Sequence, residues 1–353
     1  MRVRRMLSFL LRQASGVVAA LCALSTMSTA ETVDEFYKGR QIHLIVGSSA
    51  GGLYDTYARL IARHMGKYIP GKPTIIVQNM SGASGVTAAN FVVNSSPRDG
   101  SVMAAVQSNL PTADILRMDG VRFNGAQLSW VGSVSQETFI GFVLSRSPIM
   151  SLNDALTHEV AFGGPSLGSA SIDMSVIARK LFGFKIRIVN GYPGGSETKL
   201  AIEKGEIDGS FATGWGAVKI DQPDWIRNGT IRVLVQHGLV RNRELPDVPL
   251  LLDWAKTPED RQLLQILMAR TAFAKPYFMA PDIPPDRLDA MRRAFDHAVA
   301  DDQFLAEAAK LNVTPDGPMT GEQIADVIAQ LSKTPPSVID RINAIFAEFI
   351  AGK

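Results

Sequence analysis

The sequence predicts an α/β protein of two lobes, each built on a doubly wound sheet and joined to the other by a hinge. Apolar runs of strand length alternate with helical segments, which is typical of a parallel sheet covered by helices on both faces. The alternation restarts after Trp130, and a mostly helical third follows the segment Leu245–Pro249. A second lobe inserted in mid-chain predicts two crossings between the lobes, near residues 133–136 and 236–246.

The first lobe begins with a strand at 42–46 and a helix whose apolar face runs from Tyr54 to Met65. A second strand at 74–78, a short helix at 88–93 and a third strand at 102–106 follow. We therefore expect a parallel sheet, and because ligands lie outside the carboxyl ends of such strands, we expect the turns of both lobes to face a shared cleft.

The second lobe also alternates strands with helices. Its strands are expected near residues 139–144, 160–163, 186–189, 207–212 and 231–235, with helices around 174–181 and 198–204. The last third contains one expected strand, 273–279, and a capping box formed by Thr320 and Gln323. We assign residues 31–133 plus 246–353 to the first lobe and 134–245 to the second.

Residues 1–30 have the pattern of a secretory signal peptide. An apolar stretch, Gly16–Leu24, lies between an arginine-rich start and the small residues Ser28–Ala30, and it is too short to span a membrane. We expect export to the periplasm and cleavage near Ala30; the choice between the Sec and Tat routes stays open. The single cysteine, Cys22, lies in this leader, so we expect no disulfide, free thiol or Cys-ligated metal in the exported chain. We expect no other metal and no cofactor.

The charge balance argues against a nucleic-acid partner. The chain has 36 basic and 34 acidic residues, and removal of the four leader arginines leaves 32 against 34. A slightly acidic chain offers no electrostatic attraction to phosphate backbones.

Two glycine-rich turns, Gly47–Gly52 and Gly163–Ser169, lie between an expected strand and an expected helix. Such turns expose backbone N–H groups at the positive end of a helix dipole, which suits a carboxylate. Asp55 would cap the first helix or contact the ligand, and Trp215, after Thr213 at a strand end, would line the cleft or join the core. Hydroxyl groups in and near these turns can assist: Ser48, Ser49, Ser84, Ser108, Ser166 and Ser169.

Both turns also fit G-x-S-x-G, the pattern of a serine hydrolase, so an esterase is an alternative. A nucleophilic serine needs a histidine on a loop to accept its proton, and only His237 lies at a suitable strand end. A nucleotide-binding loop is not expected, because Leu53–Tyr54 follows the glycines where Lys and Ser or Thr are required. We therefore expect a binding protein and not an enzyme.

The chain resembles the Bug family, the solute-binding proteins of tripartite tricarboxylate transporters. The resemblance spans the whole exported chain, and five motifs in the family's order carry it. These are Val46–Asp55 with Ala58-Arg59, Asn79–Gly85 with Pro97–Gly100, Gly163–Ser169, Tyr192–Gly195 with Gly205–Asp208, and Leu245–Pro249.

The resemblance implies a two-lobed periplasmic-binding-protein (Venus-flytrap) fold that closes on a small organic carboxylate, with a large and a small membrane subunit as partners. A receptor that signals to a two-component kinase is the alternative. Departures from the family pattern, such as Ser81, Ile172 and Pro193, leave the carboxylate unnamed. The expected ligand-binding residues are Ser48, Ser49, Gly51, Gly52, Asp55, Gly82, Ala83, Ser84, Ser108, Ser166, Ser169, Tyr192, Gly194, Thr213 and Trp215.

Overall fold

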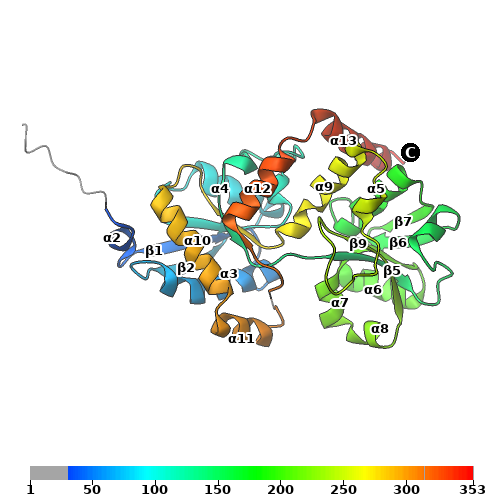
Figure 1. The fold of residues 1–353 in the computed structure, drawn as a ribbon, viewed down its shortest axis with the longest axis horizontal. Helices are drawn as coiled ribbons and strands as arrows, with labels where there is room; N and C mark the ends of the chain where they lie inside the picture. Colours follow the sequence, from blue (N-terminus) through cyan, green and yellow to red (C-terminus); the bar gives the residue numbers. More distant parts are fainter. Residues whose placement is uncertain (1–30, 314, 353) are drawn as a thin grey trace, which may run out of the picture.

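The computed structural model describes residues 31–313 and 315–352, which form two α/β lobes side by side (Figure 1). The expected signal peptide, Cys22 and the cleavage position near Ala30 lie outside the described residues. Each lobe has one sheet with helices on both faces, so the predicted fold class is confirmed. In the part of the chain that the structure describes, no helix combines the length and the apolar character needed to cross a membrane.

The sheet of the first lobe has six strands in the order β11-β4-β10-β3-β1-β2. Val46 at the end of β1 pairs with Asn79 of β2 and Ala105 of β3, so these three parallel strands end at the same edge. The strands are β1 Gln41–Val46, β2 Thr74–Asn79, β3 Val102–Ala105, β4 Ser129–Ser133, β10 Pro276–Met279 and β11 Met319–Thr320.

Helices cover both faces of this sheet. On one face, α3 and α10 pack with α2 and α11 around buried side chains such as Leu60 and Phe295, while α4 and α12 cover the other face. The capping box expected at Thr320 and Gln323 is confirmed at the start of α12. The helices are α2 Val33–Tyr37, α3 Leu53–Met65, α4 Val86–Asn94, α10 Pro285–Val299, α11 Asp302–Lys310 and α12 Gly321–Leu331, with short 3₁₀ turns η1 Gly66–Tyr68, η2 Ala83–Gly85, η3 Leu110–Thr112 and η4 Gly125–Gln127.

The sheet of the second lobe has five strands in the order β7-β6-β8-β5-β9. Helices α5, α9 and α13 lie on one face, and α6, α7 and α8 lie on the other. The elements are β5 Phe139–Leu144, β6 Val160–Gly164, β7 Ile186–Asn190, β8 Gly209–Gly214, β9 Ile231–His237, α5 Ala170–Phe182, α6 Gly195–Lys204, α7 Trp215–Asp221, α8 Pro223–Arg227, α9 Pro258–Ala272 and α13 Pro336–Ile350, with 3₁₀ turns η5 Leu152–Leu156 and η6 Leu251–Trp254.

The sheets are mixed, which corrects the expectation of parallel sheets. Strand β5 starts at the hinge, and its first residue, Phe139, pairs with the last residues of β8 and β9, Gly214 and His237. Strand β10 also starts at the hinge, and Pro276 pairs with Ser133 at the end of β4. A strand that enters a lobe at the edge where its neighbours end must run antiparallel to them. Apolar patterning carries no information on that direction.

The return crossing differs from the expected position at 236–246. Strand β9 continues to His237, and Leu250 then pairs with Gln236, so this segment stays beside the second sheet. The chain returns at Phe273–Lys275, after α9, and crosses a third time between α12 and α13. The first sheet is thus built from 31–133 with 276–331, whereas 139–272 and 336–350 lie on the second side; these bounds differ from the expected 31–133 plus 246–353 and 134–245.

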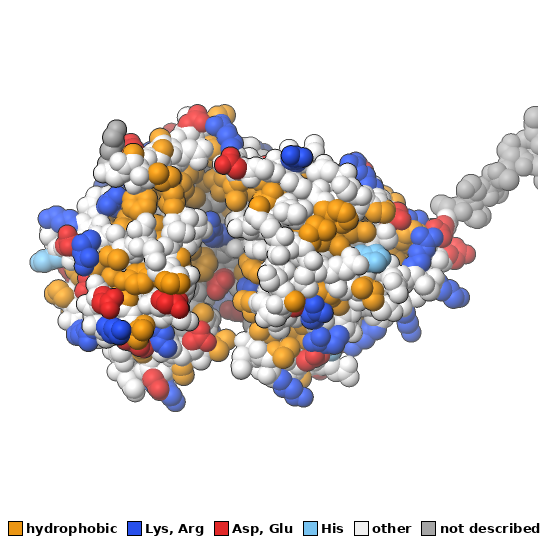
Figure 2. Space-filling view, turned by 180° about the vertical axis from the view of Figure 1, so that it is seen from behind, with side chains coloured by type: hydrophobic (Ala, Val, Ile, Leu, Met, Phe, Trp, Pro, Cys, Tyr) orange, Lys and Arg blue, Asp and Glu red, His pale blue; other side chains and the backbone are white. Residues whose placement is uncertain are grey.

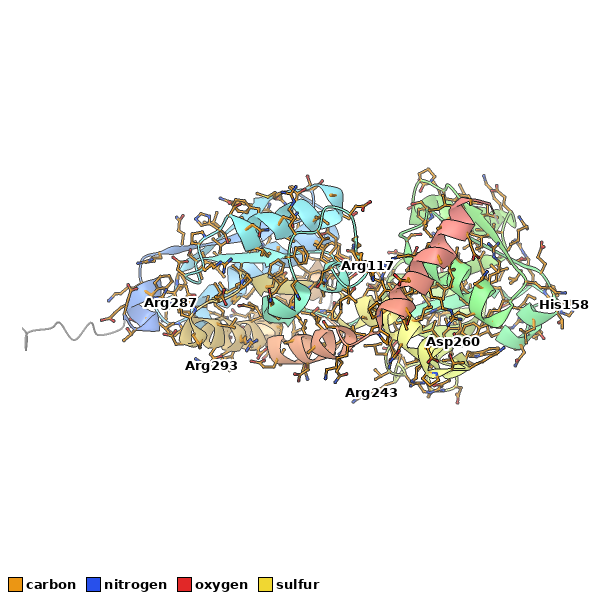
Figure 3. The ribbon with its side chains drawn as sticks, turned by 90° about the horizontal axis from the view of Figure 1, so that it is seen from above. Arg117, His158, Arg243, Asp260, Arg287 and Arg293 are labelled. Atoms are coloured by element: carbon orange, nitrogen blue, oxygen red, sulfur yellow. The ribbon has the colours of Figure 1, made fainter. Side chains whose placement is uncertain are left out.

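Two of the connections form a paired hinge. The N–H of Val134 donates to the carbonyl of Lys275 at 3.2 Å, and the N–H of Ala274 donates to Ser135 at 3.0 Å. Helix α13 is attached to the second lobe by Lys180–Glu348 (2.6 Å) and Arg341–Asp260 (2.7 Å) and reaches the first through Arg117–Asp340 (2.6 Å). In Figure 3, Arg117 lies at the border between the lobes.

Candidate functional site

The first glycine turn is held in shape by Asp55. This carboxylate is 2% exposed and accepts hydrogen bonds from the Gly51 N–H (2.8 Å), Arg59 Nε (2.9 Å) and Asn79 Nδ2 (2.9 Å). Burial alone raises the pKa of Asp55, but these hydrogen bonds outweigh it and the pKa is lowered. Because its acceptor positions are used inside the lobe, Asp55 positions the turn and does not itself face the ligand.

The turn after β2 lies beside the first turn and has an unusual backbone. Gly82, Ala83, Ser84 and Gly85 all have positive φ, from 45° to 145°, a conformation that costs about 1–2 kcal/mol for each residue with a Cβ. A Cβ added at Gly47 would lie 3.0 Å from the Cα of Gly85, so the two turns are in close contact. Strained backbone of this kind is concentrated at functional sites.

Three of the expected residues complete this edge of the first sheet. Ser49 and Gly52 are exposed, and Ser108, after β3, donates its N–H to the Tyr54 hydroxyl at 3.2 Å. The hydroxyl of Ser48 is buried without a hydrogen-bond partner among the described residues. The turns after β1, β2 and β3 are therefore neighbours, as the parallel strand order requires.

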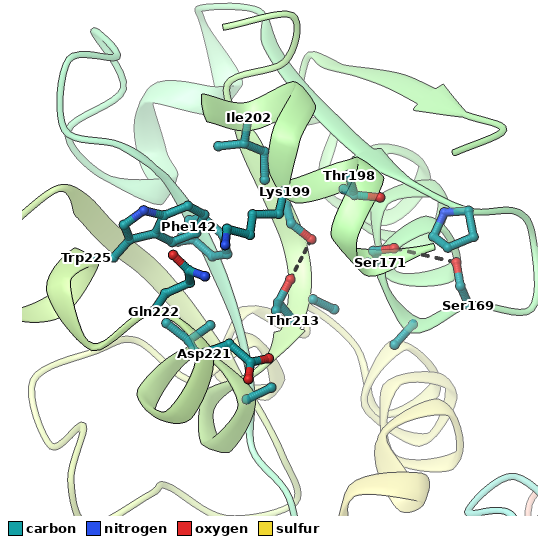
Figure 4. A pocket seen from close by; sticks show the side chains of 17 residues that line it. Phe142, Ser169, Ser171, Thr198, Lys199, Ile202, Thr213, Asp221, Gln222 and Trp225 are labelled. Atoms are coloured by element: carbon teal, nitrogen blue, oxygen red, sulfur yellow. Dashed lines mark hydrogen bonds between the residues drawn. The ribbon is translucent and has the colours of Figure 1, made fainter. Parts of the chain in front are cut away.

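The second lobe contains a cavity of about 310 Å³ between its sheet, α6 and the α7–α8 pair (Figure 4). We call it the second-lobe pocket. Of the expected residues, Ser169 and Thr213 line it, and Gly194 immediately precedes the lining residue Gly195. The pocket is lined by Phe142, Pro165, Ser169, Ala170, Ser171, Gly195, Thr198, Lys199, Ile202, Ser210, Ala212, Thr213, Ala217, Val218, Asp221, Gln222 and Trp225.

Two further expected residues, Ser166 and Tyr192, lie near this pocket without lining it. Ser166 accepts a hydrogen bond from the Ser169 hydroxyl through its carbonyl oxygen (2.6 Å). Gly191 donates its N–H to Pro165 (2.6 Å), which brings the Tyr192–Gly194 turn against the turn after β6. The half-buried Tyr192 ring packs against Val189 and Ile207.

A second cavity, of about 320 Å³, lies between the lobes at the hinge, and Figure 2 shows the molecule hollowed there. We call it the interlobe cavity. Leu53, Tyr57 and Lys275 line it from the first lobe and Trp215, Ala217 and Ile220 from the second; the remaining lining residues are Ser135, Gln136, Glu137, Thr138, Gly216, Asp221, Asn242, Asn312, Val313 and Asp316.

Lys275 is the one basic side chain among the lining residues of the interlobe cavity. It is 8% exposed, its Nζ lies 3.9 Å from Glu137 Oε2, and it lies 5.9 Å and 5.6 Å from the ring centres of Tyr54 and Tyr57. Burial lowers the pKa of Lys275, and the nearby Glu137 opposes that shift. In the described structure its Nζ makes no hydrogen bond, so this ammonium has donors to offer a ligand.

Lys275, Tyr57 and Glu137 are residues that sequence reasoning did not find. The signal for Lys275 was present: it is a lone cation inside the apolar run 273–279. Trp215 was expected and lines the interlobe cavity, with its indole N–H donating to Glu244 at 2.6 Å. Neither cavity includes residues of the Ser48–Gly52 or Gly82–Ser84 turns.

The arrangement does not support a serine hydrolase. His237 is 1% exposed, burial lowers its pKa to about 4, and neither ring nitrogen has a hydrogen-bond partner among the described residues. Its ring packs against Phe211 at 5.1 Å, inside the second lobe, while Ser49 belongs to the first. No group of three or more His, Asp or Glu side chains within residues 31–313 and 315–352 is arranged to hold a metal ion.

Comparisons with known proteins agree with the fold. No family model matches the chain. The UPF0065 protein in the gbd 5' region of Cupriavidus necator is 26% identical over 352 residues, which cover 95% of this chain and 97% of that protein. The protein BugT of Bordetella pertussis is 25% identical over 248 residues, 67% of this chain and 72% of BugT.

Solved structures show the same two-lobed fold. A TctC solute-binding protein from Polaromonas has a TM-score of 0.68 at 18% identity, covering 86% of this chain and 99% of that one. The periplasmic binding protein BugD (TM-score 0.55, 16% identity, 88% and 98%) and Rpa4515 of R. palustris, solved with adipate (0.57, 19%, 86% and 98%), are also similar. By sequence the chain is similar to UPF0065 and Bug proteins, and its fold is that of TctC- and Bug-type solute-binding proteins.

Proposed function

We propose that the protein is a receptor that captures a small organic carboxylate between its lobes and delivers it to a tripartite tricarboxylate-type membrane transporter. The observation that carries this proposal is Lys275, a buried ammonium that lines the interlobe cavity and makes no hydrogen bond among the described residues. A buried cation with unused donors is stabilised by an anion that supplies acceptors. One neighbour of the same fold was solved with adipate, a carboxylate.

The carboxylate would lie at Lys275 and at the adjacent first turn. Leu53 follows that turn directly and lines the same cavity as Lys275, so the turn and the ammonium border one space. Ser49 would offer its backbone N–H from the first lobe, whereas the N–H of Gly51 already donates to Asp55 and that of Gly52 to the Ser49 carbonyl. Gly194 would offer its backbone N–H from the second lobe, whereas the N–H and the hydroxyl of Ser169 both donate to the Ser166 carbonyl.

Closure of the lobes would couple binding to delivery. The interlobe cavity is lined from both lobes and lies against the paired hinge at 134–135 and 274–275. A ligand that contacts both lobes favours the closed form, because the full set of contacts exists only there. The closed form would then be the state that the membrane subunits recognise.

We place the protein in the periplasm, exported with its leader cleaved near Ala30, and we propose a large and a small membrane subunit as its partners. The support is the signal-peptide pattern of residues 1–30 and the kinship with proteins of this transporter class. No catalytic step is proposed, because the relatives are solute-binding proteins.

A thermal-shift screen of residues 31–353 tests the receptor function. Mono-, di-, tri- and aromatic carboxylates at millimolar concentration are compared with the matching amides and alcohols, which lack the charge. A ligand at 100 times its dissociation constant stabilises the folded state by about 2.7 kcal/mol, which raises the melting temperature by several degrees. We expect such a shift with one class of carboxylate and none with its amide; a flat response to every carboxylate contradicts the proposal.

A further inference from the structure

We infer that the ligand is a monocarboxylate whose remaining part is an apolar group that lodges in the second-lobe pocket. This inference rests on the proposed function and names the class of carboxylate. The pocket and the interlobe cavity meet at α7, because Ala217 and Asp221 line both. A carboxylate held at Lys275 or at the first turn can therefore extend past α7 into the second lobe.

The deep part of the second-lobe pocket is apolar. Phe142 and Ala212 from the sheet, Ile202 from α6 and Trp225 from α8 form its walls, and the Phe142 and Trp225 rings lie 5.7 Å apart (Figure 4). A dry cavity of about 150 Å³ is enough to hold benzene. The 310 Å³ here therefore accommodates a phenyl ring or a chain of several carbons.

The polar groups of the pocket do not favour a second carboxylate. The hydroxyl of Thr213 donates its proton to that of Ser210 at 2.8 Å, so this donor is already used. The one cation in the lining, Lys199, lies 3.9 Å from Glu203, and the acidic Asp221 lines the same pocket. With no net positive charge available, burial of a second carboxylate would be strongly unfavourable.

Binding of matched acids separates the possibilities. Isothermal titration of residues 31–353 compares hexanoate and phenylacetate with adipate, which has the same chain length as hexanoate but a second carboxylate, and with acetate, which lacks the apolar part. We expect hexanoate or phenylacetate to bind at least tenfold more tightly than adipate and acetate. Equal or tighter binding of adipate overturns this inference and leaves the receptor function intact, whereas no binding of any acid overturns both.

Filling the pocket gives an independent test. Ala212→Leu places a larger side chain in the pocket from the sheet. Ala217→Leu places one there from α7, at an exposed position where a leucine does not disturb the core. Ala309→Leu, the same change at an exposed position of α11 that lines neither cavity, is the control. In variants that melt like the unmodified protein, we expect at least tenfold weaker binding of the apolar acid for Ala212→Leu or Ala217→Leu and unchanged binding for Ala309→Leu; unchanged binding in all three overturns the inference.

Discussion

Lys275→Met will reduce the thermal shift caused by the carboxylate ligand to half or less while leaving the free protein as stable as before, or more so. The lysine is 8% exposed and its charge is only partly offset by Glu137 at 3.9 Å, so the folded protein bears a cost for holding it charged. Methionine has a similar length but no charge. The substitution therefore removes the cost of burying an ammonium and also removes the group that would bind the carboxylate. We expect at least a tenfold loss of affinity, measured by titration calorimetry.

The pH dependence of binding provides the matching control. Because burial lowers the pKa of Lys275, its ammonium loses its proton at a lower pH than the ordinary lysine value of about 10.4. Carboxylate affinity in the unmodified protein should therefore fall as the pH rises toward that range, and the affinity of Lys275→Met should not change. Lys310→Met, at an exposed position of α11, should behave like the unmodified protein. Unchanged affinity in Lys275→Met would show that the carboxylate binds elsewhere.

The strands were predictable because their apolar runs are long relative to the turns between them. In the structure, the ends of β1, β2 and β3 bring the first-lobe turns together. Strand β4 escaped this pattern. Ser129 and Ser133 are buried in it, and Ser133 uses its hydroxyl to accept from the N–H of Lys275 (3.1 Å). A polar residue buried through a hydrogen bond is counted as exposed by any hydrophobicity pattern.

The position of the return crossing and the role of the Lys275 ammonium could not be predicted from the local sequence pattern. The segment Leu245–Pro249 has the composition of a linker, yet it runs beside β9, where the N–H of Gln236 donates to Pro249 at 2.8 Å. Lys275 lines the cavity only because the second crossing lies at Phe273–Lys275. The position of this crossing is set by the tertiary structure and not by the local sequence. The resemblance to the Bug family supplied the fold and the turns but no cationic side chain for the ligand.

Asp55→Asn will loosen the first turn. All three groups that contact the Asp55 carboxylate are donors, from Gly51, Arg59 and Asn79, and the amide group of asparagine would place a donor against one of them. We expect a loss of about 2 kcal/mol in the free energy of unfolding, measured by urea denaturation, because charged hydrogen bonds of a buried group are lost. Asp119→Asn, at an exposed position with no ion pair in the described structure, should leave stability unchanged.

The effect of Asp55 must also depend on pH in a defined direction. The pKa of Asp55 is lower in the folded protein than the value of about 3.9 in an unfolded chain, so the unfolded state binds its proton first as the pH falls. The stability it contributes is therefore complete above about pH 4 and disappears as the pH falls through the lowered folded pKa. The difference in unfolding free energy between the unmodified protein and Asp55→Asn should be constant near neutral pH and shrink in acid. A difference that grew in acid would mean that Asp55 is held in its protonated form and does not clamp the turn as a carboxylate.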